Sequence, residues 1–572
     1  MAKKGANPSE DSSIEPQKKV SYQNLKDLNL WNKKTSNSLT MKIIPSTINN
    51  VIRTRPLIII LALIASAIGY NTFAQQNAVD ILPQKSRLGI NLAGPADWNT
   101  EHPFVDVFKL SRKWISQKKG MPWGKGPELE RDENGWIKRL EPDCWAETPI
   151  LTGGHAPVGE YVCLYDGEGE IDFTMNAKVV SRAPGRIVVY INAEKNGTFL
   201  AIRKTNPQNY IRNIRVIMPG HEATYKNEPF TPQFLKRWRN FNTIRFMDWM
   251  HTNGSKQRSW KDRPTPEYCN YTEKGVPVEV MVDLCNRLGV NAWFCMPHLA
   301  DDDYVRQFAA LVKKLLKPEL KIYIEYSNEV WNSMFEQNRY AQQMAKELGI
   351  PPLERPWEGA GKYYAKRSVE IFKIWEEVFG GRDRLVRVIA WQAASSPFWT
   401  DGIVLSYNDT AKNCDALAIA PYFSMNISPQ GKTINADMVA QWTVEQVLEY
   451  ARTNSIPESI RWMTTQKKVA DKYGLRLICY EAGQHFVGVG GAENNEQLTK
   501  LLIAANKHPK MAELYKIYLD AWKDISGDLM CIFSSVGTYS KWGSWGLLEA
   551  ADQSSSPKYD AVIKWLKDNP LK

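Results

Sequence analysis

Residues 322–331 read IYIEYSNEVW, an apolar and aromatic run that ends in the pair Asn328-Glu329. Short runs rich in β-branched and aromatic residues predict β-strands. A second stretch, residues 477–483, reads LICYEAG and places Glu481 directly after another apolar run. Both stretches therefore predict buried strands that end in a carboxylate.

Similar runs recur along the rest of the chain. They alternate with longer stretches that carry apolar residues at three- and four-residue steps, which is typical of strands and crossover helices in a parallel sheet. An eighth strand at 88–92 completes the set, and the predicted fold is an α/β protein built on a (β/α)8 TIM barrel. The predicted strands are 88–92, 243–249, 291–297, 321–326, 385–391, 416–422, 476–480 and 529–534.

The first two predicted barrel strands are about 150 residues apart, far more than one strand-to-helix unit requires. Residues 135–220 differ in character, because short strand-like runs there are separated by Gly, Asn and Pro turns. They predict an all-β module, a small sandwich, inserted after the first strand. The predicted division is a leader (1–74), the start of the barrel (86–134), the β-rich module (135–220) and the remainder of the barrel (221–572).

The net charge of +11 is concentrated at the N-terminus, where residues 1–74 hold ten Lys and Arg against four Asp and Glu. No basic run remains in the rest of the chain, so no nucleic-acid partner is implied. An apolar run begins at Leu57 and ends at Ile68, and the residues Asn71-Thr72-Phe73-Ala74-Gln75 follow it. This pattern predicts a secretory signal and a secreted, periplasmic or cell-surface protein, with membrane anchoring through the same run as the alternative.

The eight cysteines are scattered, and neither CxxC nor HxxxH spacing offers a metal site. We therefore expect no metal and no cofactor. A Cys144–Cys163 disulfide stays open as an alternative for an exported protein.

In a (β/α)8 barrel, reactive groups gather at the C-terminal ends of the strands. Retaining hydrolysis of a glycosidic bond needs one carboxylic acid and one carboxylate about 5 Å apart. Glu329 and Glu481 end two different strands, whereas Glu325, four residues earlier, is interpreted as structural. The residues at or just past the predicted strand ends are Asn91, Arg245, His298, Asn328, Glu329, Gln392, Tyr422, Glu481, Trp542 and Trp545.

The two stretches resemble the fourth and seventh strands of clan A glycoside hydrolases, the barrel superfamily that includes the family 5 cellulases and mannanases. The resemblance implies that Glu329 is the acid/base and Glu481 the nucleophile. It also implies supporting roles: Asn328 holds the sugar 2-hydroxyl, Arg245 supports the nucleophile, His298 lines the sugar site, Tyr422 hydrogen-bonds the nucleophile, and Trp542 or Trp545 lies under the reacting sugar.

The predicted function is a retaining glycoside hydrolase that cleaves β-glycosidic bonds of a carbohydrate of the β-glucan, mannan or xylan type. The alternative is a non-hydrolytic, exported carbohydrate-binding protein, such as a cellulose-binding one, on the same barrel. The presence of both Glu329 and Glu481 favours the enzyme, since binding alone does not need the pair.

Overall fold

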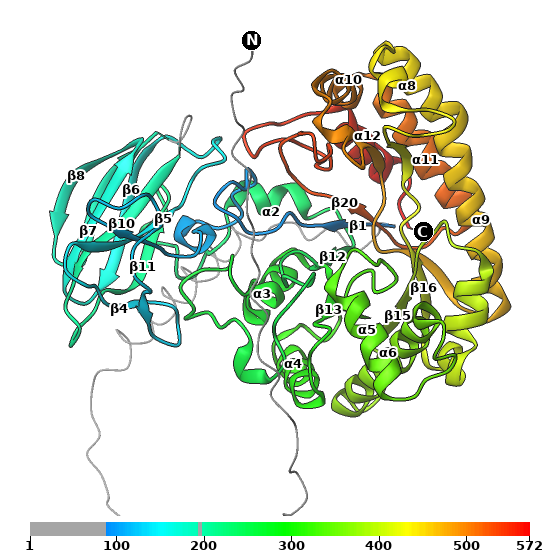
Figure 1. Ribbon diagram of the computed structural model, residues 1–572, viewed down its shortest axis with the longest axis horizontal. Helices are drawn as coiled ribbons and strands as arrows, with labels where there is room; N and C mark the ends of the chain where they lie inside the picture. The colour runs from blue at the N-terminus through cyan, green and yellow to red at the C-terminus, as the bar shows by residue number, and fades with distance from the viewer. Residues whose placement is uncertain (1–86, 193–196, 572) are drawn as a thin grey trace, which may run out of the picture. The chain divides into compact units, whose positions relative to one another are not determined.

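The computed structural model describes residues 87–192 and 197–571. Eight parallel strands close into a barrel, because the last strand pairs with the first (Figure 1). In order around the barrel they are β1 (Leu88–Asn91), β12 (Thr243–Arg245), β13 (Asn291–Met296), β14 (Ile322–Tyr326), β15 (Leu385–Ala390), β16 (Ala416–Ile419), β18 (Arg476–Cys479) and β20 (Met530–Phe533). The predicted TIM barrel and all eight of its strands are confirmed.

Differences from the prediction are confined to the strand ends. The run predicted at 243–249, for example, stops pairing after Arg245. Phe246, Met247 and Trp249 nevertheless stay buried, because the loop after β12 turns back over the barrel core. An apolar run therefore marks burial here rather than strand pairing.

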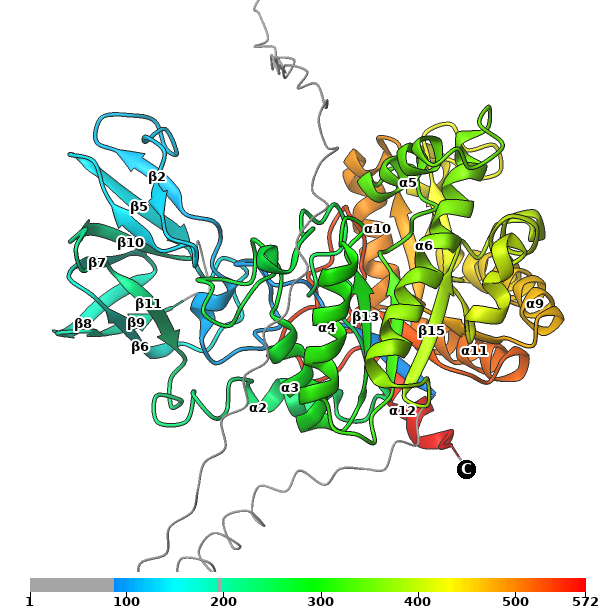
Figure 2. The same cartoon turned by 90° about the horizontal axis from the view of Figure 1, so that it is seen from below.

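Helices surround the barrel, and their apolar faces pack on it (Figure 2). Helix α4 illustrates why they form where they do: the Asp301 side chain accepts a hydrogen bond from the backbone of Tyr304 and caps the helix. The α-helices are α2 (Pro232–Trp238), α3 (Val278–Leu288), α4 (Asp302–Leu315), α5 (Glu336–Glu347), α6 (Pro356–Phe379), α7 (Ala436–Ala440), α8 (Val444–Tyr450), α9 (Ile456–Lys472), α10 (Glu496–Lys507), α11 (Lys510–Ile525) and α12 (Pro557–Asp568).

Short helical turns and two extra strands complete the barrel domain. The parallel pair β17 (Phe423–Ile427) and β19 (Gln484–Gly488) follows the ends of β16 and β18 and extends the wall of the barrel beyond them. The turns are η1 (Val107–Leu110), η2 (Trp260–Asp262), η3 (Phe398–Leu405), η4 (Tyr407–Asn413), η5 (Ala451–Ser455) and η6 (Ala492–Asn494).

The chain between β1 and β12 forms two four-stranded antiparallel sheets with their own apolar core (Figures 1 and 2). The sandwich extends further upstream than the predicted boundary at 135, because β2 already pairs with β5. Strand β2 is short and polar, so its sequence carries little strand signal. The strands of the two sheets are β2 (Ile115–Lys118), β5 (Cys144–Pro149), β6 (Gly159–Asp166), β7 (Gly169–Met175), β8 (Ala177–Ala183), β9 (Arg186–Ile191), β10 (Thr198–Thr205) and β11 (Arg212–Ile217). β3 (Glu130–Arg131) and β4 (Ile137–Arg139) pair with each other in a separate two-stranded sheet.

The long loop after β12 contacts the inserted module at β3 and the helical turn η1 that precedes the module. Arg131 pairs with Glu273 at 3.0 Å, and Lys109 Nζ donates to the carbonyl of Tyr268 at 2.8 Å. The inserted module is thus tied to a loop that starts at the C-terminal end of a barrel strand.

All eight cysteines are buried free thiols, so the Cys144–Cys163 disulfide is not formed. These two residues lie on β5 and β6, which belong to different sheets of the sandwich. Within residues 87–192 and 197–571, no helix is both long and apolar enough to cross a bilayer, and no cluster of three or more His, Cys, Asp or Glu is arranged to hold a metal ion. The predicted leader and the run from Leu57 to Ile68 lie outside the described residues.

Candidate active site

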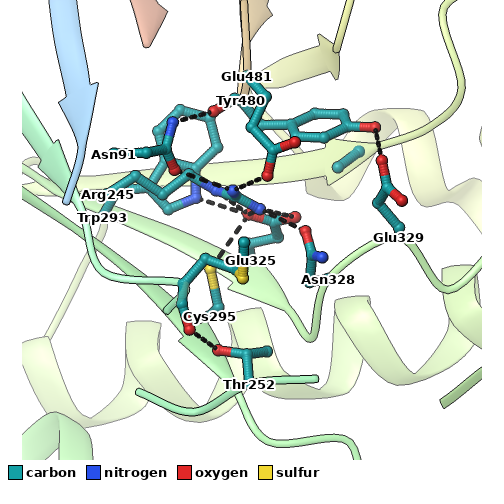
Figure 3. A network of polar contacts seen from close by, with 12 residues as sticks. Asn91, Arg245, Thr252, Trp293, Cys295, Glu325, Asn328, Glu329, Tyr480 and Glu481 are labelled. Carbon is teal, nitrogen blue, oxygen red and sulfur yellow. Dashed lines mark hydrogen bonds and ion pairs between the residues drawn. The ribbon is translucent and has the colours of Figure 1, made fainter. Parts of the chain in front are cut away.

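The carboxyl ends of the barrel strands bring most of the predicted side chains into one polar network (Figure 3). Asn91 ends β1 and lies beside Arg245 in the register of β1 and β12. Asn328 and Glu329 follow β14, and Glu481 follows β18. Parallel strands meet at one face of the barrel, so residues up to 390 positions apart in the sequence become neighbours.

Arg245 is the centre of this network and is fully buried, at 0% exposure. A guanidinium has five N–H donors, and each of them finds an acceptor here. Nε and Nη2 donate to the two oxygens of Glu325 at 3.0 and 3.1 Å. The remaining donors reach Asn91 Oδ1 (3.2 Å), Glu481 Oε1 (2.9 Å) and Asn328 Oδ1 (2.8 Å). The guanidinium therefore has one defined orientation.

Glu325 holds that orientation from below, inside the barrel. Besides Arg245, it accepts a hydrogen bond from Trp293 Nε1 at 2.8 Å and contacts the Cys295 thiol at 3.4 Å. Buried charges are tolerated only when they are paired and hydrogen-bonded, and this one meets both conditions. Glu325 is thus part of the support for Arg245, in agreement with the structural role expected for it.

Glu481 is held from two sides. Arg245 donates to Oε1 at 2.9 Å, and the Tyr422 hydroxyl donates to Oε2 at 3.0 Å. Burial raises the pKa of Glu481, and the charge of Arg245, together with these two hydrogen bonds, counteracts that rise. Of the two predicted catalytic carboxyls, Glu481 is the one with a cation in contact, so it loses its proton first.

Glu329 lies in a different environment. Its carboxyl accepts hydrogen bonds from Tyr480 OH at 3.2 Å and Asn332 Nδ2 at 3.0 Å, and it makes no ion pair among the described residues. Burial raises the pKa of Glu329 to about 7, and the charge of Glu481 contributes to the rise. An acid with this pKa keeps its proton below neutral pH and in about half of the molecules at pH 7, while the cation beside Glu481 favours the ionised form of that carboxyl. General acid catalysis requires such a pair.

The backbone around Asn328 is strained. Ser327 and Glu329 have φ values of 60° and 42°, in the left-handed region that residues other than glycine seldom adopt. Such residues cost roughly 1–3 kcal/mol each and persist only where the surrounding structure holds them. Two backbone bonds do so here, from Ser327 N to Met296 O (2.8 Å) and from Asn332 N to Glu329 O (2.8 Å). The strained backbone turns the side chains of two consecutive residues, Asn328 and Glu329, toward the opening at the C-terminal ends of the barrel strands, the mouth of the barrel.

Asn328 is oriented by residues that the sequence did not single out. Its Oδ1 accepts from Arg245, and its Nδ2 donates to Asn253 Oδ1 at 3.1 Å. Gln337, on α5, donates from Nε2 to the same Asn253 oxygen at 2.7 Å and to the Asn328 carbonyl at 2.8 Å. Since an amide nitrogen has two hydrogens, one N–H of Asn328 remains available for a ligand.

The two predicted tryptophans differ in position. The Trp545 ring packs against Tyr422 (5.9 Å between centroids) and His485 (4.9 Å), beside the residue that holds Glu481. Trp542 is 64% exposed, and Lys541 lies over its ring at 4.7 Å. Of the pair, Trp545 is the one that the structure places at the network.

His298 is not part of the network. It is buried, and its ring contacts Tyr340 of α5 at 5.4 Å. Neither ring nitrogen has a hydrogen-bond partner among the described residues, and burial lowers its pKa to about 4. The charges that act on it, Glu336, Lys256 and Arg258, are different from those around Glu481.

Three further residues of the site escaped the sequence analysis: Tyr480, Asn253 and Asp248. Tyr480 immediately precedes Glu481, and its ring also lies under Arg245, 5.1 Å from the guanidinium carbon. Its position next to a predicted site residue was the only available signal. Asn253 lies in the loop after β12, where no periodic pattern indicates which side chains point inward. Asp248 falls inside the strand predicted at 243–249, but β12 ends at Arg245 and Asp248 lies in the loop after it.

No protein-family model and no curated protein sequence matches the chain. Among solved structures, the chain is similar to the CBM22-1–GH10 modules of the Clostridium thermocellum endo-1,4-beta-D-xylanase 10B, complexed with xylohexaose. The two share 10% sequence identity, the match covers 83% of this chain and 98% of that chain, and the TM-score is 0.34. Xylanase B from Clostridium stercorarium F9 has 14% identity over 58% of this chain and 93% of its own, with a TM-score of 0.32. The endo-1,4-beta-D-mannanase of Thermotoga petrophila RKU-1 has 11% identity over 58% and 93%, with a TM-score of 0.29. Values this low assign neither activity nor substrate, so the function has to be argued from the site.

Proposed function

We propose that the chain is a retaining glycoside hydrolase that cleaves β-glycosidic bonds in a carbohydrate of the β-glucan, mannan or xylan type. One observation carries this proposal. Two carboxyls, Glu329 and Glu481, end different barrel strands in environments that separate their pKa values, since only Glu481 contacts a cation. Paired acids with separated pKa values are what double displacement at a sugar needs.

In the first step, the Glu481 carboxylate attacks the anomeric carbon while Glu329 protonates the departing oxygen. The glycosidic bond breaks, and a covalent glycosyl ester forms on Glu481. As its negative charge is lost, Arg245 and Tyr422 keep the carboxyl group in place through their hydrogen bonds. In the second step, Glu329, now ionised, removes a proton from water, which attacks the anomeric carbon and releases Glu481.

The proposal is tested by assaying the protein on aryl β-glycosides and a panel of polysaccharides beside Glu329→Gln and Glu481→Gln. Both variants should lose several orders of magnitude in kcat, because each removes one of the two reacting groups. Glu347→Gln, an exposed carboxyl on α5, is the matched control and should keep full activity. Retention is read from the anomer of the first product by ¹H NMR.

Glu329→Ala assayed with added azide separates the two roles. If Glu329 is the acid/base, azide replaces water in the second step and gives a β-glycosyl azide. A protein that binds polysaccharide but hydrolyses no substrate, and whose two Gln variants bind equally well, would instead be a carbohydrate-binding protein.

A further inference from the structure

A third acidic side chain lies at the same mouth. Asp248 follows Arg245 by three residues, just past the end of β12, and is partly exposed. Its carboxylate has no hydrogen bond or ion pair to any residue in the described part of the chain, whereas Glu325 and Glu481 each accept from two or more donors. An ionised carboxylate accepts hydrogen bonds and donates none. Among the described acidic residues at this mouth, Asp248 is therefore the one whose carboxylate oxygens accept no hydrogen bond from the protein.

Two loops hold Asp248 in place. The indole of Trp249 donates to the Ala93 carbonyl at 3.0 Å, which fastens the loop after β12 to the loop after β1. Gly94 lies against Asp248, because a Cβ added there would be 3.4 Å from the Cβ of Asp248 and 3.9 Å from its carboxyl carbon. Since the neighbouring residue is a glycine, position 94 itself places no side chain on the carboxylate.

The charges of the site act on Asp248. Burial raises the pKa of Asp248 to about 7, the charge of Glu481 adds to the rise, and the charge of Arg245 opposes it. Asn91 and Arg245 end the neighbouring strands β1 and β12 and hydrogen-bond each other at 3.2 Å, and Arg245 also donates to Glu481. Asp248 lies three residues past Arg245 and against Gly94, three residues past Asn91, so it lies at the same end of the barrel as Glu481.

We propose that Asp248 is a specificity-determining residue, whose carboxylate accepts hydrogen bonds from hydroxyl groups of a neutral sugar at Glu481 and excludes sugars that carry a carboxylate, such as uronic acids. Two hydroxyls of a neutral sugar can donate to the two oxygens of one carboxylate. A uronic acid would add a negative charge beside Asp248 and Glu481, and like charges repel strongly in a partly buried site. This inference rests on the proposed function, because it assumes that a sugar binds at Glu481.

The test is run at pH 8, where a carboxyl with a pKa of about 7 is mostly ionised. It compares aryl glycosides that differ only at carbon 6, glucoside against glucuronide and galactoside against galacturonide. In the parent, kcat/KM for the neutral member should far exceed that for the uronide. In Asp248→Asn, which keeps the size and removes the charge, kcat/KM for the neutral member should fall by about 10- to 100-fold, as expected for a hydrogen bond to a charged group. The ratio of kcat/KM for the neutral glycoside to kcat/KM for the uronide should fall by at least about tenfold.

Asp303→Asn is the control, because Asp303 is an exposed carboxylate on α4. It should change neither rates nor preference. If Asp248→Asn lowers kcat/KM equally for every glycoside and leaves the preference unchanged, Asp248 is only a structural residue and the inference is overturned.

A binding experiment separates this inference from the proposed hydrolysis. Calorimetry with the Glu329→Gln protein, with and without Asp248→Asn, measures affinity for neutral xylo-, cello- and manno-oligosaccharides and for oligogalacturonate. If the parent hydrolyses nothing but discrimination in binding depends on Asp248, the proposed hydrolysis fails and the inference stands. If the parent hydrolyses a substrate but discrimination in binding does not depend on Asp248, the proposed hydrolysis stands and the inference about Asp248 is overturned. If none of these oligosaccharides binds, the inference is overturned.

Discussion

Nη1 of Arg245 donates a hydrogen bond to Oε1 of Glu481 at 2.9 Å, and the other four N–H bonds of this guanidinium are also engaged. Replacing Arg245 by Met would leave Glu325 and Glu481 buried without a counter-charge. We expect a loss of about 3–5 kcal/mol in the free energy of unfolding, measured by urea denaturation at pH 7. Arg245→Lys should also lose activity, because an ammonium group cannot reproduce the five-donor fork.

The Arg245→Met defect should depend on pH. Without the cation, the folded-state pKa of Glu481 rises further above its value in the unfolded state, so the folded protein binds more protons. Stability is then retained at low pH and lost as pH rises through the folded-state pKa of Glu481. Arg306→Met, which breaks an exposed pair with Glu377, is the control and should cost less than about 1 kcal/mol. Equal losses for the two variants would contradict the role assigned to Arg245.

Glu329 should set the alkaline limb of the pH profile. Its pKa of about 7 means that kcat/KM should fall as pH rises above about 7, because the acid loses the proton that it must donate. The Tyr480 hydroxyl donates to the ionised form of Glu329 and so lowers this pKa. Tyr480→Phe should therefore move the alkaline limb to higher pH.

The profiles of the parent and Tyr480→Phe are measured as kcat/KM between pH 5 and 9 on one aryl glycoside. Tyr190→Phe, at an exposed tyrosine of β9, serves as the control. A limb that stays in place in Tyr480→Phe, or moves to lower pH, would show that Glu329 does not titrate on that limb.

Asn253 should act on the substrate through Asn328. Its side-chain oxygen holds Nδ2 of Asn328, and the resemblance to clan A enzymes assigns Asn328 to the sugar 2-hydroxyl. Asn253→Ala should lower kcat/KM by about 10-fold on ordinary glycosides, in keeping with one weakened hydrogen bond in the transition state. It should have little effect on 2-deoxy glycosides, which lack that hydroxyl.

Asn253→Asp keeps the acceptor oxygen and should recover most of the lost rate. A residue with a purely structural role would slow both classes of glycoside alike. Equal effects on the ordinary and the 2-deoxy substrates would therefore count against the positioning role.

Trp545 and Trp542 should differ in importance. Trp545 packs against Tyr422, and its truncation to Ala should lower kcat/KM on a monosaccharide aryl glycoside by about tenfold, through lost stacking and a displaced Tyr422. Trp542→Ala is the matched comparison and should leave this substrate unaffected, since its ring is mostly in solvent. Equal losses would mean that both rings line the sugar site.

Most of the barrel could be predicted from the sequence because its strands are buried on both faces. β13 and β16, for example, are buried at every position, and residues 292–296 and 416–419 appear in the sequence as continuous apolar runs. β8 is the opposite case, because most of its side chains are exposed at the edge of the sandwich. A strand that buries few side chains leaves no apolar pattern to detect.

The residues of the candidate site also differ in how far the sequence could predict them. Glu329 and Glu481 could be proposed because each directly follows a strand, and the end of a barrel strand is a known place in the fold. Asp248, Asn253 and Gln337 could not, because they come from a loop and from a helix. Which of their side chains reach Asn328 or the mouth depends on how these segments pack.

By itself, the sequence determined the barrel, the order of its strands and the two carboxyls that follow two of them, since each follows from local burial and from the order of elements. Only the tertiary structure decided which carboxyl contacts a cation, which tryptophan lies beside Tyr422, and that His298 stays outside the network. Those relationships join residues hundreds of positions apart, and no local pattern records them. The free energy of an ion in the interior depends on the partners that the folded chain brings to it, so the difference between Glu329 and Glu481 arises only in three dimensions.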